Sequence, residues 1–381
     1  MKILELNKYY YTNSYLYYLF DSLIYSEKSK AKTSKKEFLF SIGISYSSYR
    51  REKSSGIASN MTMKTLTTYF KINNIEAIDK NKYETIINRL YYNSYYKNLN
   101  LISKYLVEIQ EFIDRNNYLR PLFVLFKVFG YLNMNCSIDY LKTKLSNEIN
   151  YLKQISSSYF YDQYEVLYLS IVEFLGLKIN SIKLDKLLNK YDDLNWMVYT
   201  LKASNFYIEK RFSCALSFLQ KALTIYNNDN NIVRSNIIIA NIAAIYNIKH
   251  DYISTLKFLD GILKYVYSDE NAVWISNILQ HYIHALFMLN KYHEIIQILL
   301  SSILDLSKAN SLSLVELILT IRHKGNELLF EKYKLLFYND PNVQVILEFI
   351  ETKEKSVLLK LENTIYFNQI IKKIKKKYFI I

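Results

Sequence analysis

Apolar residues recur at helical spacing along almost the whole chain. The run from Ser14 to Lys30, SYLYYLFDSLIYSEKSK, is an early example, and later runs of the same kind alternate with short polar loops such as NNDNN and YNDPN. Turn-forming residues are scarce, with 2 Pro and 6 Gly in 381 residues. A β-rich fold of this size needs many turns built from those residues, whereas helices joined by short polar loops do not. The pattern therefore predicts an all-α protein.

Near the N-terminus the pattern predicts several short helices in close succession. Ser34 followed by Glu37 has the spacing of a capping box, so a helix should begin there and end at Gly43, which permits a left-handed turn. Ile44 should then enter the core, and Ser45 should cap a further helix. A last helix is predicted in NMTMKTLTTYFKI, residues 60–72.

The helix that follows Ser45 is expected to bury Tyr49 and to leave its polar side chains exposed. Exposed basic and hydroxyl side chains can contact phosphates and base edges in a DNA groove. The candidate DNA-binding residues are Lys35, Lys36, Tyr46, Ser47, Ser48, Arg50, Arg51 and Lys53. The alternative is a lysine-rich helical cap that makes no contact with a groove.

Charge supports the DNA interpretation through its distribution. The chain has a formal net charge of +14, but it is also rich in Lys, Asn, Ile and Tyr, as products of AT-rich coding sequence are, so codon bias could explain part of that charge. Residues 1–75 alone hold 12 Lys and Arg against 5 Asp and Glu. A positive charge concentrated in one segment is better support for a nucleic-acid partner than one spread over the whole chain.

The 36 residues from Glu37 to Ile72 resemble the helix-turn-helix of phage-repressor-like regulators. The shared pattern is a helix, a glycine, a turn of small residues, a polar reading helix and a closing helix. Two positions depart from it: Leu39 stands where alanine is usual, and Glu52 stands where an apolar residue usually packs the reading helix down. The resemblance implies operator DNA as a partner.

The rest of the chain is expected to contain degenerate helical repeats. The predicted organisation is a DNA-binding domain in residues 1–75, a connector in 76–95 and a helical-repeat domain in 96–381.

Large and small apolar residues recur at the spacing of a tetratricopeptide-like helix pair in three registers 40 residues apart. These are Tyr199, Ala203, Phe206, Ala215, Leu219 and Ala222, then Ile239, Ala243, Tyr246, Thr255, Leu259 and Ile262, then Leu279, Ile283, Leu286, Ile295, Leu299 and Ser302. Stacked pairs would form a right-handed superhelix with an inner groove.

Polar residues on the inner helices of these pairs are candidates for binding an extended peptide, because their side chains donate to and accept from a peptide backbone. The candidate peptide-binding residues are Asn241, Asn247, Asn277, Gln280, His281 and His284. The alternative is that this face simply meets solvent.

No catalytic or cofactor site is expected. His281 and His284 have no carboxylate or cysteine at a matching metal-ligand spacing, and no phosphate loop, zinc-protease motif or nucleophile elbow is found. We therefore expect no enzyme, no cofactor and no metal. The two cysteines, Cys136 and Cys214, do not make a disulfide framework. With no signal-peptide core and no run of about 18 apolar residues, a cytoplasmic protein without a membrane partner is expected.

The C-terminal segment IIKKIKKKYFII places five lysines between residues 372 and 377. A terminal amphipathic helix that caps the repeats or meets a second subunit is favoured over a contact with nucleic acid or a membrane surface.

As a whole, the order of elements resembles the peptide-sensing regulators of Gram-positive bacteria and their phages, the RNPP and Rgg groups and the arbitrium receptors. This resemblance implies a homodimer that binds operator DNA and is controlled by a short signalling peptide. The competing hypothesis is a helical-repeat scaffold that binds a protein partner and never meets DNA.

Overall fold

The computed structural model confirms an all-α chain, with helices and no strand in the residues that it describes. These residues are 13–55, 57, 59–72, 80–114, 119–134, 138–155, 159–160, 163–174, 179, 181–188, 190, 192–266, 273–300 and 310–375. None of the described helices is both long enough and apolar enough to cross a membrane. The chain divides into two compact units, Met1–Glu209 and Lys210–Ile381.

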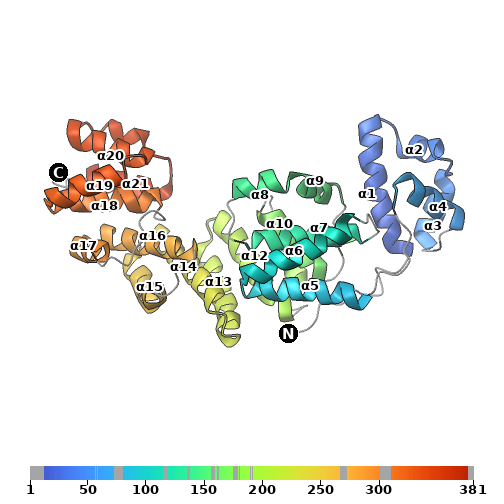
Figure 1. The fold of residues 1–381 in the computed structure, drawn as a ribbon, viewed down its shortest axis with the longest axis horizontal. Helices are drawn as coiled ribbons and strands as arrows, with labels where there is room; N and C mark the ends of the chain where they lie inside the picture. Colours follow the sequence, from blue (N-terminus) through green and yellow to red (C-terminus); the bar gives the residue numbers. More distant parts are fainter. Residues whose placement is uncertain are drawn as a thin grey trace. The chain divides into compact units, whose positions relative to one another are not determined.

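The first unit begins with four helices, α1 to α4, and continues with further helices (Figure 1). The four are α1 (Asn13–Ala31), α2 (Lys35–Ser41), α3 (Tyr46–Ser55) and α4 (Asn60–Tyr69). They are followed by α5 (Lys80–Tyr95), α6 (Leu99–Asp114), α7 (Arg120–Leu132), α8 (Ile138–Lys144), α9 (Ser146–Gln154), α10 (Gln163–Phe174), α11 (Ser181–Leu187), the 3-10 helix η3 (Asp192–Leu194) and α12 (Asn195–Ile208). The predicted connector, residues 76–95, therefore contains helix α5.

Helices α1 to α4 share a small core. Tyr17 and Phe20 of α1, Leu39 of α2, Tyr49 of α3 and Leu66 of α4 are each fully buried. The helix-turn-helix pattern named above usually has alanine at the position of Leu39. Leucine is larger, so its complete burial shows that this core accommodates the extra volume.

Two features hold the remaining helices of the first unit together: stacked aromatic side chains, and a glycine in α7 against which leucine side chains of neighbouring helices pack closely. Phe112 and Phe123 stack with their ring centroids 4.9 Å apart. Gly130 lies in α7, where an added Cβ would come within 2.9 Å of Leu106 and 3.2 Å of Leu90. Glycine at this position therefore allows α7 to pack closely against α6 and α5, and a larger side chain would force them to move.

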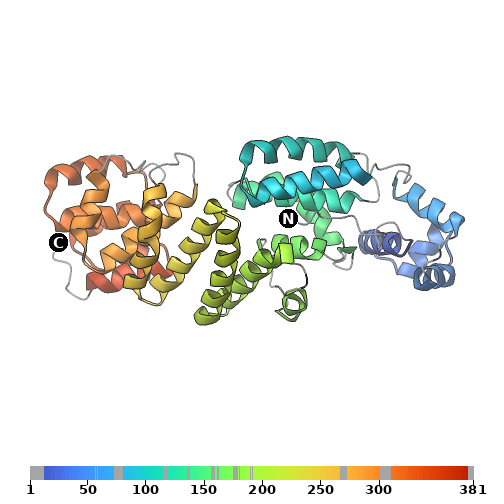
Figure 2. The same cartoon turned by 90° about the horizontal axis from the view of Figure 1, so that it is seen from below.

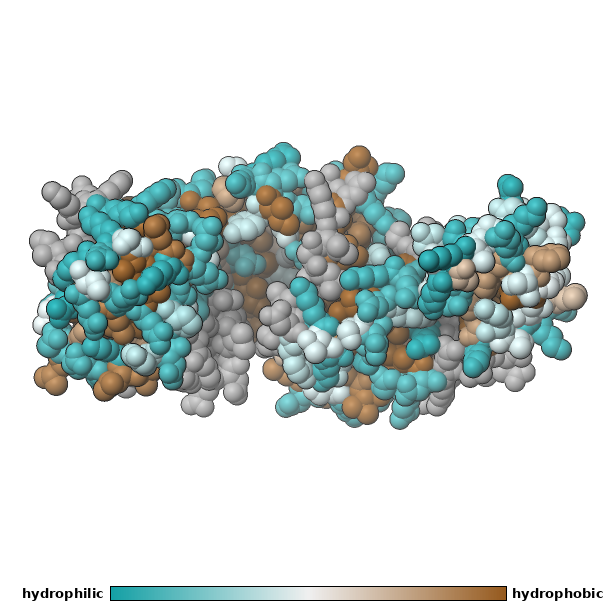
Figure 3. All heavy atoms as spheres, turned by 90° about the horizontal axis from the view of Figure 1, so that it is seen from above, coloured by the Kyte–Doolittle hydropathy of each residue, from teal (hydrophilic) through white to brown (hydrophobic). Residues whose placement is uncertain are grey.

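The second unit is a succession of helices (Figure 2), in which each helix from α13 to α18 packs against the next and α20 packs against α18. They are α13 (Phe212–Asn228), α14 (Ile232–Ile248), α15 (Tyr252–Val266), α16 (Val273–Met288), α17 (Tyr292–Leu300), α18 (Ser311–His323), α19 (Glu327–Leu336), α20 (Pro341–Thr352), the 3-10 helix η5 (Val357–Lys360) and α21 (Ile365–Lys375). On the face drawn in Figure 3, hydrophilic residues cover most of the described surface and hydrophobic ones form small patches.

Residues in the left-handed conformation follow several helices around the boundary of the two units. Lys210, His250 and Asn290 lie at the turns that follow α12, α14 and α16, and their φ angles are 60°, 61° and 63°. Asn230, at the turn after α13, also has a positive φ, 53°, so left-handed residues end several helices of this region. The first predicted pair, α12 and α13, straddles the boundary between the two compact units.

Candidate nucleic-acid interface and ligand face

The turn between α2 and α3 has the local geometry predicted from the sequence. The Ser34 hydroxyl accepts a hydrogen bond from the Glu37 backbone N–H, and the Glu37 carboxylate accepts one from the Ser34 N–H, which completes the capping box. Gly43 has φ +80°, and its position leaves open space where a Cβ would stand. The backbone conformation, rather than crowding, therefore favours glycine here. Ile44 is buried directly after it.

Helix α3 turns Tyr49 and Glu52 inward and exposes Arg50 and Arg51. The Glu52 carboxylate accepts hydrogen bonds from the Tyr17 hydroxyl (2.7 Å), the Ser59 backbone N–H (3.1 Å) and the Thr62 hydroxyl (3.2 Å). Burial acts to raise the pKa of Glu52, but these donors outweigh it and hold that pKa below its usual value. Glu52 thus packs α3 against α1 and α4 through hydrogen bonds where an apolar residue was expected.

A second polar cluster surrounds Asp21 of α1. Its carboxylate forms ion pairs with Lys35 of α2 and Lys53 of α3 and accepts a 2.7 Å hydrogen bond from the Tyr49 hydroxyl. Burial acts to raise the pKa of Asp21, yet the three donors together lower it. Lys35 and Lys53 are therefore already paired inside the helical cluster, so they are weaker candidates for phosphate contacts than the sequence suggested.

The other predicted DNA-binding residues remain available on the surface. Lys36, Ser47, Arg50 and Arg51 are exposed, and Tyr46 and Ser48 are half-buried. The Arg50 guanidinium lies 6.0 Å from the centroid of the Tyr46 ring. The described part of α1 to α4 thus presents two adjacent arginines on a helix whose other face is anchored, which is a suitable arrangement for phosphate and base-edge contacts.

The predicted peptide-binding residues separate into an exposed group and a buried group. Asn241 is exposed on α14, and Gln280 is half-buried on α16, where its side chain is hydrogen-bonded to Asn310. Asn277 belongs to α16, but its side chain lies outside the described residues. Asn247 and His284 are fully buried, and His281 is 9% exposed. The expected groove is therefore filled at these last three residues.

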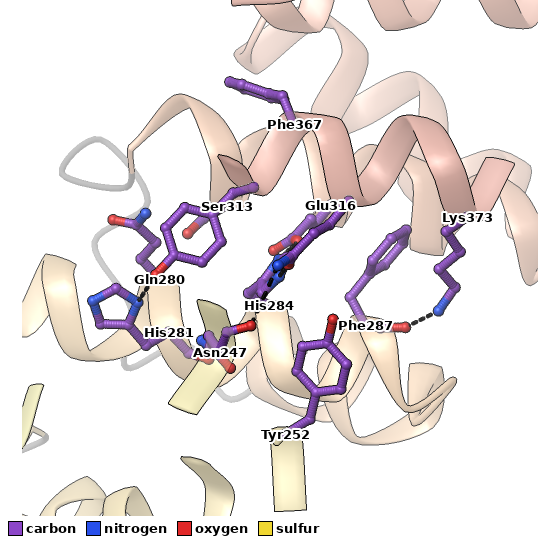
Figure 4. Close-up of polar contacts among 12 residues, drawn as sticks. Asn247, Tyr252, Gln280, His281, His284, Phe287, Ser313, Glu316, Phe367 and Lys373 are labelled. Carbon is purple, nitrogen blue, oxygen red and sulfur yellow. Dashed lines mark hydrogen bonds and ion pairs between the residues drawn. The ribbon is translucent and has the colours of Figure 1, made fainter. Parts of the chain in front are cut away.

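The filling element is α21, the C-terminal helix (Figure 4). His284 Nδ1 lies 2.5 Å from Glu316 Oε1 of α18, and His284 Nε2 lies 2.6 Å from Gln369 Oε1 of α21. The Gln369 amide donates to the Asn247 carbonyl at 3.3 Å. His284 therefore has an oxygen atom within hydrogen-bonding distance of each ring nitrogen, one from α18 and one from α21.

Burial changes the pKa values of the ionisable groups around this cluster. It raises the pKa of Glu316 against the opposing effect of His284, and it lowers the pKa of Lys373 to about 8 against the opposing effect of Glu316. Burial, together with the charge of His284, lowers the pKa of His281 to about 4. His281 is thus neutral at physiological pH, and its Nδ1 lies 3.4 Å from the Tyr366 hydroxyl.

No metal centre emerges from these contacts. Among the described residues, no group of three or more His, Cys, Asp or Glu side chains could hold a metal ion. The His284 and Glu316 pair is instead completed by Gln369, whose amide is a hydrogen-bonding partner.

Comparisons with known proteins found no relative of this chain. No protein-family model, curated protein or solved structure matches the chain. The residues that the sequence analysis missed are Asp21 and Glu52 in the first unit, and Glu316, Gln369 and Lys373 in the second. Their partners are 7 to 35 residues away in the first unit and 32 to 122 residues away in the second, so a local pattern could not have revealed the full set of contacts.

Proposed function

We propose that the chain is a DNA-binding transcriptional regulator, with α2, the Gly43 turn and α3 acting as a helix-turn-helix and the second unit acting as a tetratricopeptide-like receptor for a short peptide. The observation that carries this proposal is the orientation of α3. Tyr49 and Glu52 anchor one side of the helix, while Arg50 and Arg51 are exposed on it. An anchored helix with free basic residues is suited to lie in the major groove.

Selection of duplex DNA from a random pool by the full-length chain tests this function. We expect enrichment of a pseudo-palindromic site, because two copies related by a two-fold axis read two half-sites. The affinity for the enriched duplex should also fall steeply with salt, as phosphate contacts require. Recovery of unenriched DNA, with no affinity above that for a random duplex, would favour the rival function, a protein-binding scaffold. One observation favours this scaffold function: Lys35 and Lys53 are paired with Asp21 and are therefore less available to DNA.

The proposed homodimer has a candidate interface on α19. Leu328, Leu335 and Leu336 are 88%, 76% and 61% exposed, and Glu331 and Lys332 are exposed between them. Positions 328, 331, 332 and 335 share one face of a helix. If a second copy packs antiparallel about a two-fold axis near 331 and 332, Leu328 meets the partner's Leu335, and Glu331 meets the partner's Lys332. In this arrangement the face pairs apolar with apolar and acidic with basic side chains, as a two-fold interface requires.

A charge exchange on α19 tests this interface. Glu331→Lys and Lys332→Glu should each weaken the dimer, because each places like charges opposite one another, and the double variant should restore it. Analytical ultracentrifugation at several concentrations measures the dissociation constant. Leu359→Glu is the matched control, since Leu359 is 74% exposed on η5 and lies outside this face. A dimer unaffected by either single exchange would place the interface elsewhere.

A further inference from the structure

Helix α21 is bound along one face of the second unit through side chains from successive turns. Tyr366, Gln369 and Lys373 follow the spacing i, i+3 and i+7. The Tyr366 hydroxyl donates to the Ala244 carbonyl of α14 (3.4 Å), and Lys373 donates to the Phe287 carbonyl of α16. Gln369 bonds to both α14 and α16. One short helix thus spans the two inner helices of the second and third predicted pairs.

An apolar stripe accompanies the polar one. Phe367, Ile370 and Ile374 have the same i, i+3 and i+7 spacing and are 2%, 0% and 3% exposed. This combination is how an amphipathic helical peptide binds in a groove: apolar anchors supply burial, and a neighbouring row of polar side chains sets the register. The contacts of α21 are therefore of the kind that an amphipathic peptide makes in a groove.

Helix α21 leaves this face incompletely satisfied. In the described part of the chain, Glu316 Oε2 and Ser313 Oγ of α18 are buried and have no hydrogen-bond partner. The two residues are one turn apart on α18. Buried polar atoms are normally paired, so two orphans on one helix indicate that a hydrogen-bonding partner is missing from the contact surface. A ligand that supplied such a partner here would bind better than α21 in this respect.

We propose that α21 is an exchangeable occupant, and that the face formed by α14, α16 and α18 binds a short, amphipathic, lysine- or arginine-bearing peptide in its place. The cation of the peptide takes the position of Lys373 near Glu316, and its amide or hydroxyl groups take the positions of Gln369 and Tyr366. The inference rests on the proposed function, because it names the class of the peptide and the step by which that peptide acts, the displacement of α21.

A labelled peptide with the sequence of residues 364–375, TIYFNQIIKKIK, tests the exchange in trans. Fluorescence anisotropy measures its binding to the full-length chain and to the full-length variant Gln369→Ala/Lys373→Ala, in which the internal helix is held more weakly. We expect the variant to bind the peptide at least about tenfold more tightly, since the apparent affinity rises with the fraction of molecules whose site is vacant. Adding Glu316→Ala to this variant should abolish the gain. A peptide carrying the same two alanines is the matched control and should bind neither chain.

Hydrogen exchange on the wild-type chain provides a second readout that needs no variant. Amides of α21 should exchange faster than those of α18, and excess peptide should speed them further. Equal peptide affinity for wild type and variant, together with α21 amides as slow as those of α18, would overturn the proposal and make α21 a permanent part of the core. Neither assay contains DNA, so exchange without DNA binding would refute the regulator alone, and DNA binding without exchange would refute this inference alone.

Discussion

The double variant Arg50→Ala/Arg51→Ala is expected to lower affinity for the selected duplex by about 100-fold or more, because each arginine contact to a base or phosphate contributes about 1 to 3 kcal/mol. Both side chains are exposed on α3, while the buried side of that helix is held by Tyr49 and Glu52. Their removal should therefore leave the helices intact. The slope of log affinity against log salt should also become shallower by about 2 if both contact phosphates.

Single variants of the paired lysines are the matched controls for this experiment. Lys35→Ala and Lys53→Ala also remove one positive charge each, but both lysines are already paired with Asp21. Their effect on DNA affinity should be several-fold smaller than that of Arg50→Ala or Arg51→Ala. Titration of labelled duplex at three salt concentrations measures all of them, and circular dichroism confirms that the helical content is unchanged. Wild-type affinity in the double variant would exclude α3 as the reading helix.

Local features of the first unit were predictable because they depend on residues close together in sequence. The capping box needs only Ser34 and Glu37, and the turn needs only a residue that tolerates the φ of Gly43. Glu52 shows where this reasoning stops. Its polar character argued against burial, but Tyr17, which lies 35 residues earlier, supplies a hydrogen bond that compensates for desolvation. Only the packing of α1 against α3 brings this donor into place.

The same limit explains the outcome in the second unit. Periodicity predicted helices at Asn247, His281 and His284, and the structure places these residues on α14 and α16. Periodicity says nothing about which element lies opposite, and the partner, α21, is separated from His284 by 85 residues. The sequence favoured a C-terminal helix that caps the repeats or meets a second subunit, but it did not indicate which lysine would be buried. Lys373 is buried, with its ammonium group 4.5 Å from the centroid of the Phe287 ring. Cation–π contact and a backbone carbonyl make that burial tolerable.

Control by a ligand would require that the two occupants of the α21 site differ in their effect on DNA binding. A peptide that displaces α21 changes operator affinity only as far as it binds one DNA-binding state better than the other. Titrating the peptide into the complex of protein and duplex measures this difference directly, and a ligand that binds without such a difference would act as no switch.

Glu316→Ala is expected to cost the second unit about 3 to 5 kcal/mol of unfolding free energy, since removing one member of a buried pair leaves the other charged or polar and without compensation. Glu316 and His284 are both fully buried and 2.5 Å apart. Glu316→Gln retains the shape and an acceptor oxygen and should cost less. The double variant His284→Leu/Glu316→Leu should cost less than the sum of its two single changes, because no unpaired partner remains.

The pH dependence separates this effect from simple loss of packing. The pKa of Glu316 is raised in the folded chain above its usual 4.5, so above pH 4.5 the folded state holds a proton that the unfolded state has lost. This group therefore contributes stability that declines as pH rises from 4.5 through the folded pKa. Urea unfolding at several pH values, monitored through hydrogen exchange of α16 and α18, measures the free energy of unfolding. This free energy should decline with rising pH more steeply in wild type than in Glu316→Gln. Parallel pH profiles for the two proteins, or additive losses in the Leu variants, would mean that Glu316 and His284 do not act as a pair.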